Sequence, residues 1–152
     1  MNTLSVMRRW LLAVLGLGLV GTGADLILTK HYETAAQAVP LASIALALAV
    51  LIWHGIKGDG LSIRALQATM VLFLAAGIAG TGLHFWGGAE FQLEIDPSQS
   101  RWDIVKKVMR ATVPPVLAPG VMVQLGLVGL AYAYRHPALK LDASSQSEGV
   151  LK

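Results

Sequence analysis

Two short stretches of the chain hold most of the side chains that could bind a metal ion or move a proton. In each stretch, a Gly-Thr-Gly tripeptide ends an apolar run and a histidine and acids follow it. Imidazole and carboxylate groups together are good ligands for zinc, iron and copper. If the two stretches meet in the fold, their histidines and acids could close around one ion. The candidate ligand residues are His31, Glu33, His84, Glu90 and Glu94, of which the first four are the metal candidates.

The spacing of these residues leaves other interpretations open. His31 and Glu33 are two residues apart, which suits a loop or a strand better than one face of a helix. Glu90 and Glu94, if they lie on a strand, would stand ~13 Å apart, too far to share an ion without a bend. The same groups could instead hydrogen-bond to one another and to nearby arginines. They would then fix a polar cap over the helices.

A haem group is a further interpretation, because haem iron takes axial histidine ligands. His31 and His84 are expected at one depth of a membrane, and His54 and His136 near its opposite surface. Histidines at membrane boundaries are also common as ordinary interfacial polar residues. The sequence therefore assigns neither haem nor a metal ion.

The composition predicts a membrane protein. Apolar residues make up 55% of the chain and charged residues 14%, with a mean hydropathy of +0.60, whereas soluble domains have roughly 45–50% and 25%. The absence of cysteine excludes disulfides, thiolate metal sites and cysteine nucleophiles. Basic residues form no stripe with interleaved aromatics, so no nucleic-acid surface is predicted. Phosphate-loop and hydrolase signatures are also absent, which argues against a conventional enzyme.

Four apolar runs have about the length that a helix needs to cross a membrane. They cover residues 10–28, 39–56, 65–86 and 112–134. We therefore expect an all-α protein with four transmembrane helices in residues 1–137 and a disordered cytoplasmic tail over 138–152. The first run could also be a cleavable signal peptide, with the small residues of the first Gly-Thr-Gly at its cleavage site. The matching Gly-Thr-Gly at residues 80–82 ends an internal helix, however, so this tripeptide does not by itself indicate cleavage.

Basic residues predict the orientation, since they are more frequent in cytoplasmic loops. Seven basic residues lie on the side of the termini and five on the other side. This bias predicts cytoplasmic N- and C-termini. The two histidine–acid stretches would then face away from the cytoplasm.

The expected outer cap, residues 87–111, contains two patterns. Residues 90–96 alternate between polar and apolar, which is the period of a half-buried strand. Residues 100–110 instead place apolar side chains on one helical face, with basic residues off that face. This predicts an amphipathic helix, either lying in the membrane surface or packed on the helical bundle.

Two features within the spans raise the hypothesis of a small proton or cation transporter. Asp25 is the only acid inside a predicted span, and an intramembrane carboxylate must be paired, protonated or in contact with water. Its plainer role would be to cap the helix or to pair with Lys30. In the fourth run, Pro119 followed by Gly120 should kink or break the helix.

The two halves of the chain share an order of features that would fit a parallel duplication of a helix pair. Each half has an apolar helix, a Gly-Thr-Gly, a histidine with acids, and a second helix with proline near its start. Glycines in the first and third spans should let neighbouring helices approach closely. These glycines are Gly16, Gly18, Gly21, Gly23, Gly77, Gly80 and Gly82.

Several segments of the chain resemble those of small four-span bacterial inner-membrane proteins. The similar segments are Lys30 to Glu33, His84 to Pro97, Leu117 to Gly120 and Ala131 to Pro137. The resemblance implies the bacterial inner membrane and cytoplasmic termini, and it carries no activity. We therefore expect an accessory or binding protein in contact with lipid, working as a homo-oligomer or as a subunit of a membrane complex. The alternatives are a transporter or channel protomer and a metal- or haem-binding redox protein.

Overall fold

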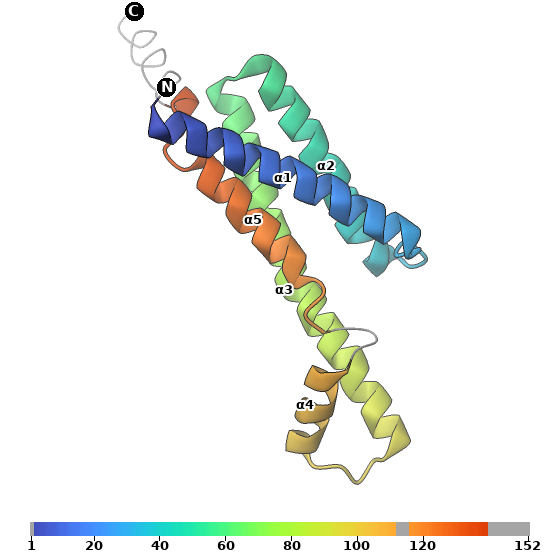
Figure 1. Cartoon of the computed structure of the whole chain (residues 1–152). Helices are drawn as coiled ribbons and strands as arrows, with labels where there is room; N and C mark the ends of the chain where they lie inside the picture. The colour runs from blue at the N-terminus through green and yellow to red at the C-terminus, as the bar shows by residue number, and fades with distance from the viewer. Residues whose placement is uncertain (1, 112–115, 140–152) are drawn as a thin grey trace, which may run out of the picture.

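The structure, a computed structural model, describes residues 2–111 and 116–139, and all regular secondary structure in these ranges is helical. The helices are α1 (Thr3–Leu28), α2 (Ala35–Lys57), α3 (Gly60–Ile95), α4 (Arg101–Arg110) and α5 (Gly120–Ala133) (Figure 1). α1, α2 and α3 are each long and apolar enough to cross a membrane. α5 is apolar but has only 14 residues, about 21 Å of helix against a ~30 Å hydrocarbon layer. The described part of the chain is thus all-helical, as expected for a membrane protein, with three helices long and apolar enough to span a membrane and one short apolar helix.

Four of the helices form a ring. α3 packs against α2 and α5, and α1 closes the ring by packing against the same two helices. α3 has 36 residues and continues past the ends of its neighbours, where it carries α4 (Figure 1). We call the ring of α1, α2, α3 and α5 the bundle, and the segment 81–111 the arm. The start of α1 and the α2–α3 turn lie at the end of the bundle opposite to the arm (Figure 1).

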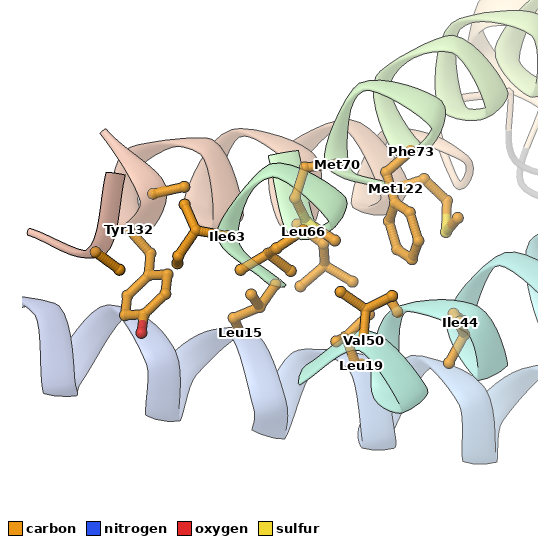
Figure 2. Packing of buried hydrophobic residues seen from close by; sticks show 14 residues of the cluster. Leu15, Leu19, Ile44, Val50, Ile63, Leu66, Met70, Phe73, Met122 and Tyr132 are labelled. Carbon is orange, nitrogen blue, oxygen red and sulfur yellow. The ribbon is translucent and has the colours of Figure 1, made fainter. Parts of the chain in front are cut away.

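The centre of the bundle is a continuous apolar core to which all four helices contribute (Figure 2). Leu15, Leu66, Met70 and Phe73 are completely buried in it. Large apolar side chains also cover the outside of the bundle, as at Leu17, which is 77% exposed. Such a surface is stable in contact with lipid chains and unfavourable in water. The bundle is therefore built to be surrounded by hydrocarbon.

The turns at the ends of α2 account for its actual length. Thr34 and Gln37 form a capping box, with side chains that satisfy backbone N–H groups at the start of the helix. α2 therefore begins at Ala35, four residues before the expected start at residue 39. Pro40 accordingly lies inside the helix and not in its first turn. At the other end, Gly58 adopts a φ of 61° and stops the helix.

α3 starts immediately after this turn because Asp59 is its N-cap residue. The backbone N–H of Ser62 donates to Oδ1 of Asp59 at 2.8 Å. This bond and the neighbouring hydroxyl of Ser62 hold the pKa of Asp59 below its usual value. The third helix therefore begins at Gly60, five residues before the expected start of the third span.

The expected strand over residues 90–96 is wrong, because α3 continues as a helix to Ile95. Alternation over seven residues is a weak signal, and a lone strand has no partner to complete its hydrogen bonds. Helix formers favour the alternative here, since the segment contains glutamate, glutamine and leucine. A hydrogen bond of 2.7 Å from Trp86 Nε1 to the carboxylate of Glu90, one helical turn away, also favours the helix. The apolar side of the supposed strand is exposed in the helix, as at Phe91 and Ile95.

α4 folds back along α3 and packs its apolar side against it. Ile104 and Val108 are buried against Phe85 and Ala89 of α3. The opposite side of α4 leaves large side chains in the open, including Trp102, which is 66% exposed. The amphipathic pattern of residues 100–110 therefore corresponds to a helix that is packed on the end of another helix.

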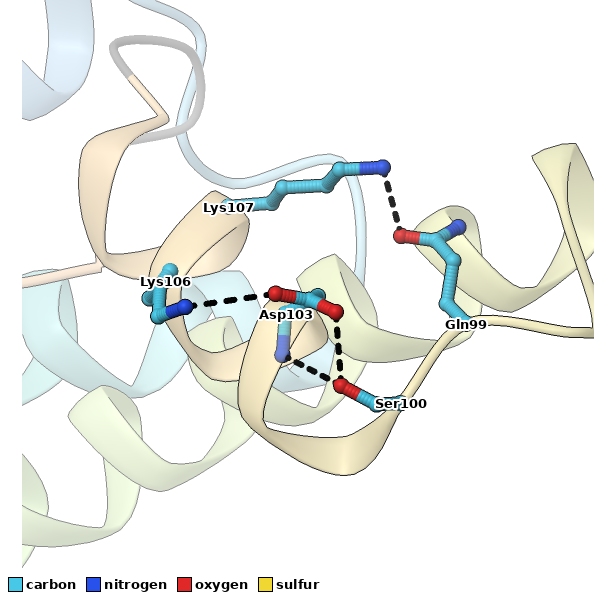
Figure 3. A network of polar contacts seen from close by, with 5 residues as sticks. All are labelled: Gln99, Ser100, Asp103, Lys106 and Lys107. Atoms are coloured by element: carbon cyan, nitrogen blue, oxygen red, sulfur yellow. Dashed lines mark hydrogen bonds and ion pairs between the residues drawn. The ribbon is translucent and has the colours of Figure 1, made fainter.

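Polar contacts hold the turn between α3 and α4 (Figure 3). The backbone N–H of Asp103 donates to Ser100 Oγ, and the Ser100 hydroxyl donates to Asp103 Oδ2. Lys106 pairs with Asp103 at 3.3 Å. The Ser100 hydrogen bond, followed by Lys106, lowers the pKa of Asp103. Gln99 donates to the backbone oxygens of Gln92 and Asp96 and so completes the end of α3.

The last helix differs from the expected span over residues 112–134. Residues 116–119 form a turn, Pro119 is the N-cap residue, and α5 begins at Gly120. Pro119 therefore lies at the start of the helix, where the lack of an N–H group costs little. Residues 112–115 and the predicted tail after residue 139 lie outside the described ranges.

Candidate functional site

His31 is placed by the way in which α1 ends. The N–H of Lys30 donates to the carbonyl oxygen of Ile27 at 3.1 Å, and the N–H of His31 donates to that of Leu26 at 2.8 Å. This pair of bonds is a Schellman motif. Lys30 has a φ of 54°, in the left-handed region that usually holds glycine. The motif turns the chain so that His31 leaves the helix axis immediately after α1.

We expect Lys30→Gly to raise the free energy of unfolding by about 1 kcal/mol, since a side chain in the left-handed region costs about 1–2 kcal/mol and the greater freedom of glycine in the unfolded chain offsets part of this gain. Thermal unfolding followed by circular dichroism in detergent would measure the change. The matched variant Lys57→Gly, in the last turn of α2, should lower stability by up to about 1 kcal/mol. A loss of stability in Lys30→Gly would contradict the left-handed geometry of this turn.

His84 lies on α3 and meets His31. Their ring centroids are 6.3 Å apart and the ring planes are inclined at 36°. Nδ1 of His84 is buried and has no hydrogen-bond partner among the described residues. A buried nitrogen without a partner is uncommon, because leaving it unpaired costs about 1–3 kcal/mol. The pair therefore has capacity for one more ligand.

The other residues of the predicted site do not join this pair. Glu33, Glu90 and Glu94 are exposed, and Glu90 accepts the hydrogen bond from Trp86. Over residues 2–111 and 116–139, no three histidine, cysteine, aspartate or glutamate side chains are grouped closely enough to hold a metal ion. The predicted set of four ligands is therefore not assembled. Two of its members come together, and both are histidines.

Asp25 lies on the exposed surface of α1, near its end. Among the described residues, the one ion pair shorter than 4.0 Å joins Lys106 and Asp103. Asp25 therefore does not form the predicted ion pair with Lys30. Asp25 and the turn at Pro119 belong to different helices. The hypothesis that they line a transport path gains no support from these positions.

The sequence did not predict a polar network at the opposite end of the bundle. The Ser62 hydroxyl donates to the carbonyl oxygen of Asp59 at 2.8 Å, so its oxygen can accept from Nδ1–H of His54, also at 2.8 Å. Nε2 of His54 must then accept from the hydroxyl of Tyr132, again at 2.8 Å. His54, Ser62 and Tyr132 are all buried. Each polar group in the chain of hydrogen bonds is thereby satisfied.

His136 extends this network toward the surface. Its ring centroid is 5.3 Å from those of both His54 and Tyr132. Burial, and then the nearby His54 and Arg8, lower the pKa of His136. The sequence held two signals for this cluster. Tyr132 and His136 are four residues apart, and His54 and Ser62 stand on either side of a short segment that contains Gly58, Asp59 and Gly60.

No family model matches the chain, and no curated protein or solved structure is significantly similar to it. The geometry of its own residues is therefore the basis on which a function can be proposed.

Proposed function

We propose that the chain is an integral protein of the bacterial inner membrane that acts as an accessory or binding protein, with a transition-metal ion held between His31 and His84. The observation that carries the proposal is the meeting of these two imidazoles from separate parts of the chain, with a buried ring nitrogen that has no partner. Imidazole suits zinc, copper, iron and nickel. The proposal gives the protein a binding role and assigns no catalytic group.

The distance between the rings supports an ion between them. A histidine nitrogen binds zinc at about 2.0–2.1 Å, which places the ion roughly 3.2 Å from the ring centroid. Two rings bound to one ion then have centroids roughly 5.2 Å apart at the tetrahedral angle and roughly 6.4 Å apart on opposite sides of the ion, and the 6.3 Å found here lies within this range. An ion bound in this way would need little movement of the backbone, and it could give Nδ1 of His84 the partner that it lacks.

Two histidines leave the coordination of most metals incomplete. Zinc usually takes four ligands, of which water may supply one in an open site. The remaining ligands would come from water, from a second copy of the chain or from a partner subunit. Where a second copy or a partner supplies them, metal binding would depend on assembly, as expected for a homo-oligomer or for a subunit of a larger complex.

Metal content after purification and desalting tests the proposal. We expect metal to be retained at a fixed ratio to protein, and His31→Gln or His84→Gln to weaken binding by at least about 100-fold, because a ligand is lost. His136→Gln removes a histidine from the other end of the bundle and should leave binding unchanged. The proposal fails if the wild type retains no metal, or if His136→Gln loses as much metal as the other two variants. Visible absorption at roughly 400–430 nm would assign the histidines to haem instead.

The proposed orientation places the arm and the two histidines outside the cytoplasm. Because the chain has no cysteine, single cysteines can report it without background. Ser98→Cys on the arm should react with a membrane-impermeant maleimide in intact spheroplasts. Lys57→Cys, in the last turn of α2, should react only after lysis. The opposite labelling pattern would place the histidine pair in the cytoplasm.

A further inference from the structure

An open cleft with both charged and apolar side chains lies at the end of the bundle that is remote from His31 and His84. It has a volume of about 260 Å³ and lies between the first turns of α1 and the segment that follows α5. α1 contributes Ser5, Arg8, Arg9 and Leu12, and Tyr132 and His136 lie across from them. The hydroxyl of Tyr132 is bound to His54, so Tyr132 lines the cleft without a free donor. The cleft therefore has two guanidinium groups on one side and aromatic rings on the other.

Arg8 is fixed in the cleft by the end of α5. One of its terminal nitrogens, Nη2, lies 3.4 Å from the carbonyl oxygen of Tyr134 and 3.2 Å from that of Arg135 and donates to both. These carbonyls lie just beyond the C-terminus of α5, and the partial negative charge of a helix C-terminus favours a cation. The donors on Nε and Nη1 of Arg8 remain for a ligand. A guanidinium held in this way is already oriented for an anion.

His136 adds a neutral donor. The backbone N–H of Ala138 donates to Nδ1 of His136 at 3.3 Å, so the neutral ring carries its proton on Nε2. Within the described residues, no carboxylate lies within 4.0 Å of the guanidinium of Arg8 or Arg9. The described part of the cleft is therefore rich in donors and positive charge.

We infer that this cleft binds the phosphate group of an anionic phospholipid. Arginine is well suited to phosphate, which it can bind through two parallel hydrogen bonds. Trp10 follows the cleft residue Arg9 in the chain, and the carbonyl oxygen of Tyr134 accepts from Arg8. Both aromatic side chains are 65% exposed, as expected at the depth of lipid head groups. Leu12 lines the cleft, and the apolar outer surface of α1 continues from it, so an acyl chain could follow the helix. Basic pockets between transmembrane helices are known to bind lipid head groups.

This role is independent of the proposed metal site, and native mass spectrometry of protein–lipid adducts tests it. The protein in detergent would be titrated with phosphatidylglycerol and, separately, with phosphatidylcholine. We expect one phosphatidylglycerol to bind preferentially. Arg9→Gln and His136→Gln should each weaken that binding, by about tenfold for the arginine, whose loss removes a charged hydrogen bond. Arg9→Gln keeps the contact of Arg8 with α5 and so protects against loss of the fold.

The matched control is Arg64→Gln. Arg64 is exposed near the start of α3, at the same end of the bundle as the cleft, but it does not line the cleft. The substitution should leave lipid binding unchanged. An equal loss in Arg64→Gln would show unspecific attraction between charges and overturn the assignment. Equal binding of the two lipids would also overturn it. Finally, inorganic phosphate at millimolar concentration should not displace the lipid, and full displacement would show that the cleft takes a soluble phosphate instead.

Discussion

Gly77→Ala is expected to destabilise the bundle by about 2 kcal/mol, because α5 leaves no room for a methyl group at this position. A Cβ atom on Gly77 would lie 2.9 Å from the backbone nitrogen of Val123 and 3.0 Å from the carbonyl oxygen of Pro119. Both are main-chain atoms of the segment that begins α5, so no side-chain rotation can relieve the contact. α5 would have to move away from α3, the helix with which it shares its most extensive contact.

The matched variant is Gly82→Ala, on the same helix and five residues further along. A Cβ atom there meets nothing within 4 Å, so the greater helix propensity of alanine should stabilise the protein by roughly 0.5–1 kcal/mol. In thermal unfolding, Gly77→Ala should lower Tm by roughly 4–8 °C, and Gly82→Ala should keep or raise it. If the two variants behave alike, the close approach of α3 and α5 at Gly77 is wrong.

These glycines show how far the sequence predicts helix packing. Their number in the first and third spans predicts that helices approach closely, and Gly18, Gly23, Gly77 and Gly80 do face a neighbouring helix. Gly16, Gly21 and Gly82 face open space in a single chain. Helical periodicity places a residue on a face, but only the tertiary arrangement decides which face has a neighbour. Glycine content alone therefore predicts that close packing exists and not where it lies.

The long apolar runs predicted four membrane helices, and three of them correspond to helices that are long and apolar enough to cross a membrane. Such runs are a strong signal because each extends over some twenty residues. The ends of these helices depend on single side chains. Thr34 and Asp59 start helices earlier than hydropathy suggests, because a capping side chain can extend a helix through polar residues. At its other end, α3 also extends through polar residues, and residues 90–95 are helical. There the alternating pattern extends over too few residues to outweigh helix propensity and the lack of a partner strand.

The candidate site could be predicted only in part. The matching positions of His31 and His84, each near the outer end of a predicted span, placed them at a similar depth, and their contact follows from the packing of the bundle. The acids belong to the predicted site because each stretch has a histidine and acids close together in the sequence. On a helix, Glu90 turns to Trp86 instead. The contacts of His54 with Ser62 and Tyr132 depend on a tight turn and on the packing of α5, neither of which periodicity describes.

The network around His54 gives the second large expected effect. Tyr132 is 5% exposed and His54 is 6% exposed. Tyr132→Phe keeps the shape of the ring but removes the hydroxyl that donates to Nε2 of His54. The nitrogen would then be buried without a partner, while Nδ1–H remains bound to Ser62 and prevents the ring from turning to another acceptor. Leaving a buried acceptor unpaired costs about 1–3 kcal/mol.

We therefore expect Tyr132→Phe to lower the free energy of unfolding by about 1–2 kcal/mol, toward the lower part of that range because hydrogen bonds in membrane proteins are often modest. Chemical unfolding in mixed micelles would measure it, with Tyr134→Phe as the control. Tyr134 is 65% exposed, and loss of its hydroxyl should change stability by less than about 0.5 kcal/mol. In a His54→Leu background the Tyr132→Phe change should cost less, because no histidine nitrogen is then left unpaired. An equal cost in both backgrounds would mean that Tyr132 stabilises the bundle through its ring alone, and that the chain of hydrogen bonds from Tyr132 through His54 to the α2–α3 turn contributes nothing to the fold.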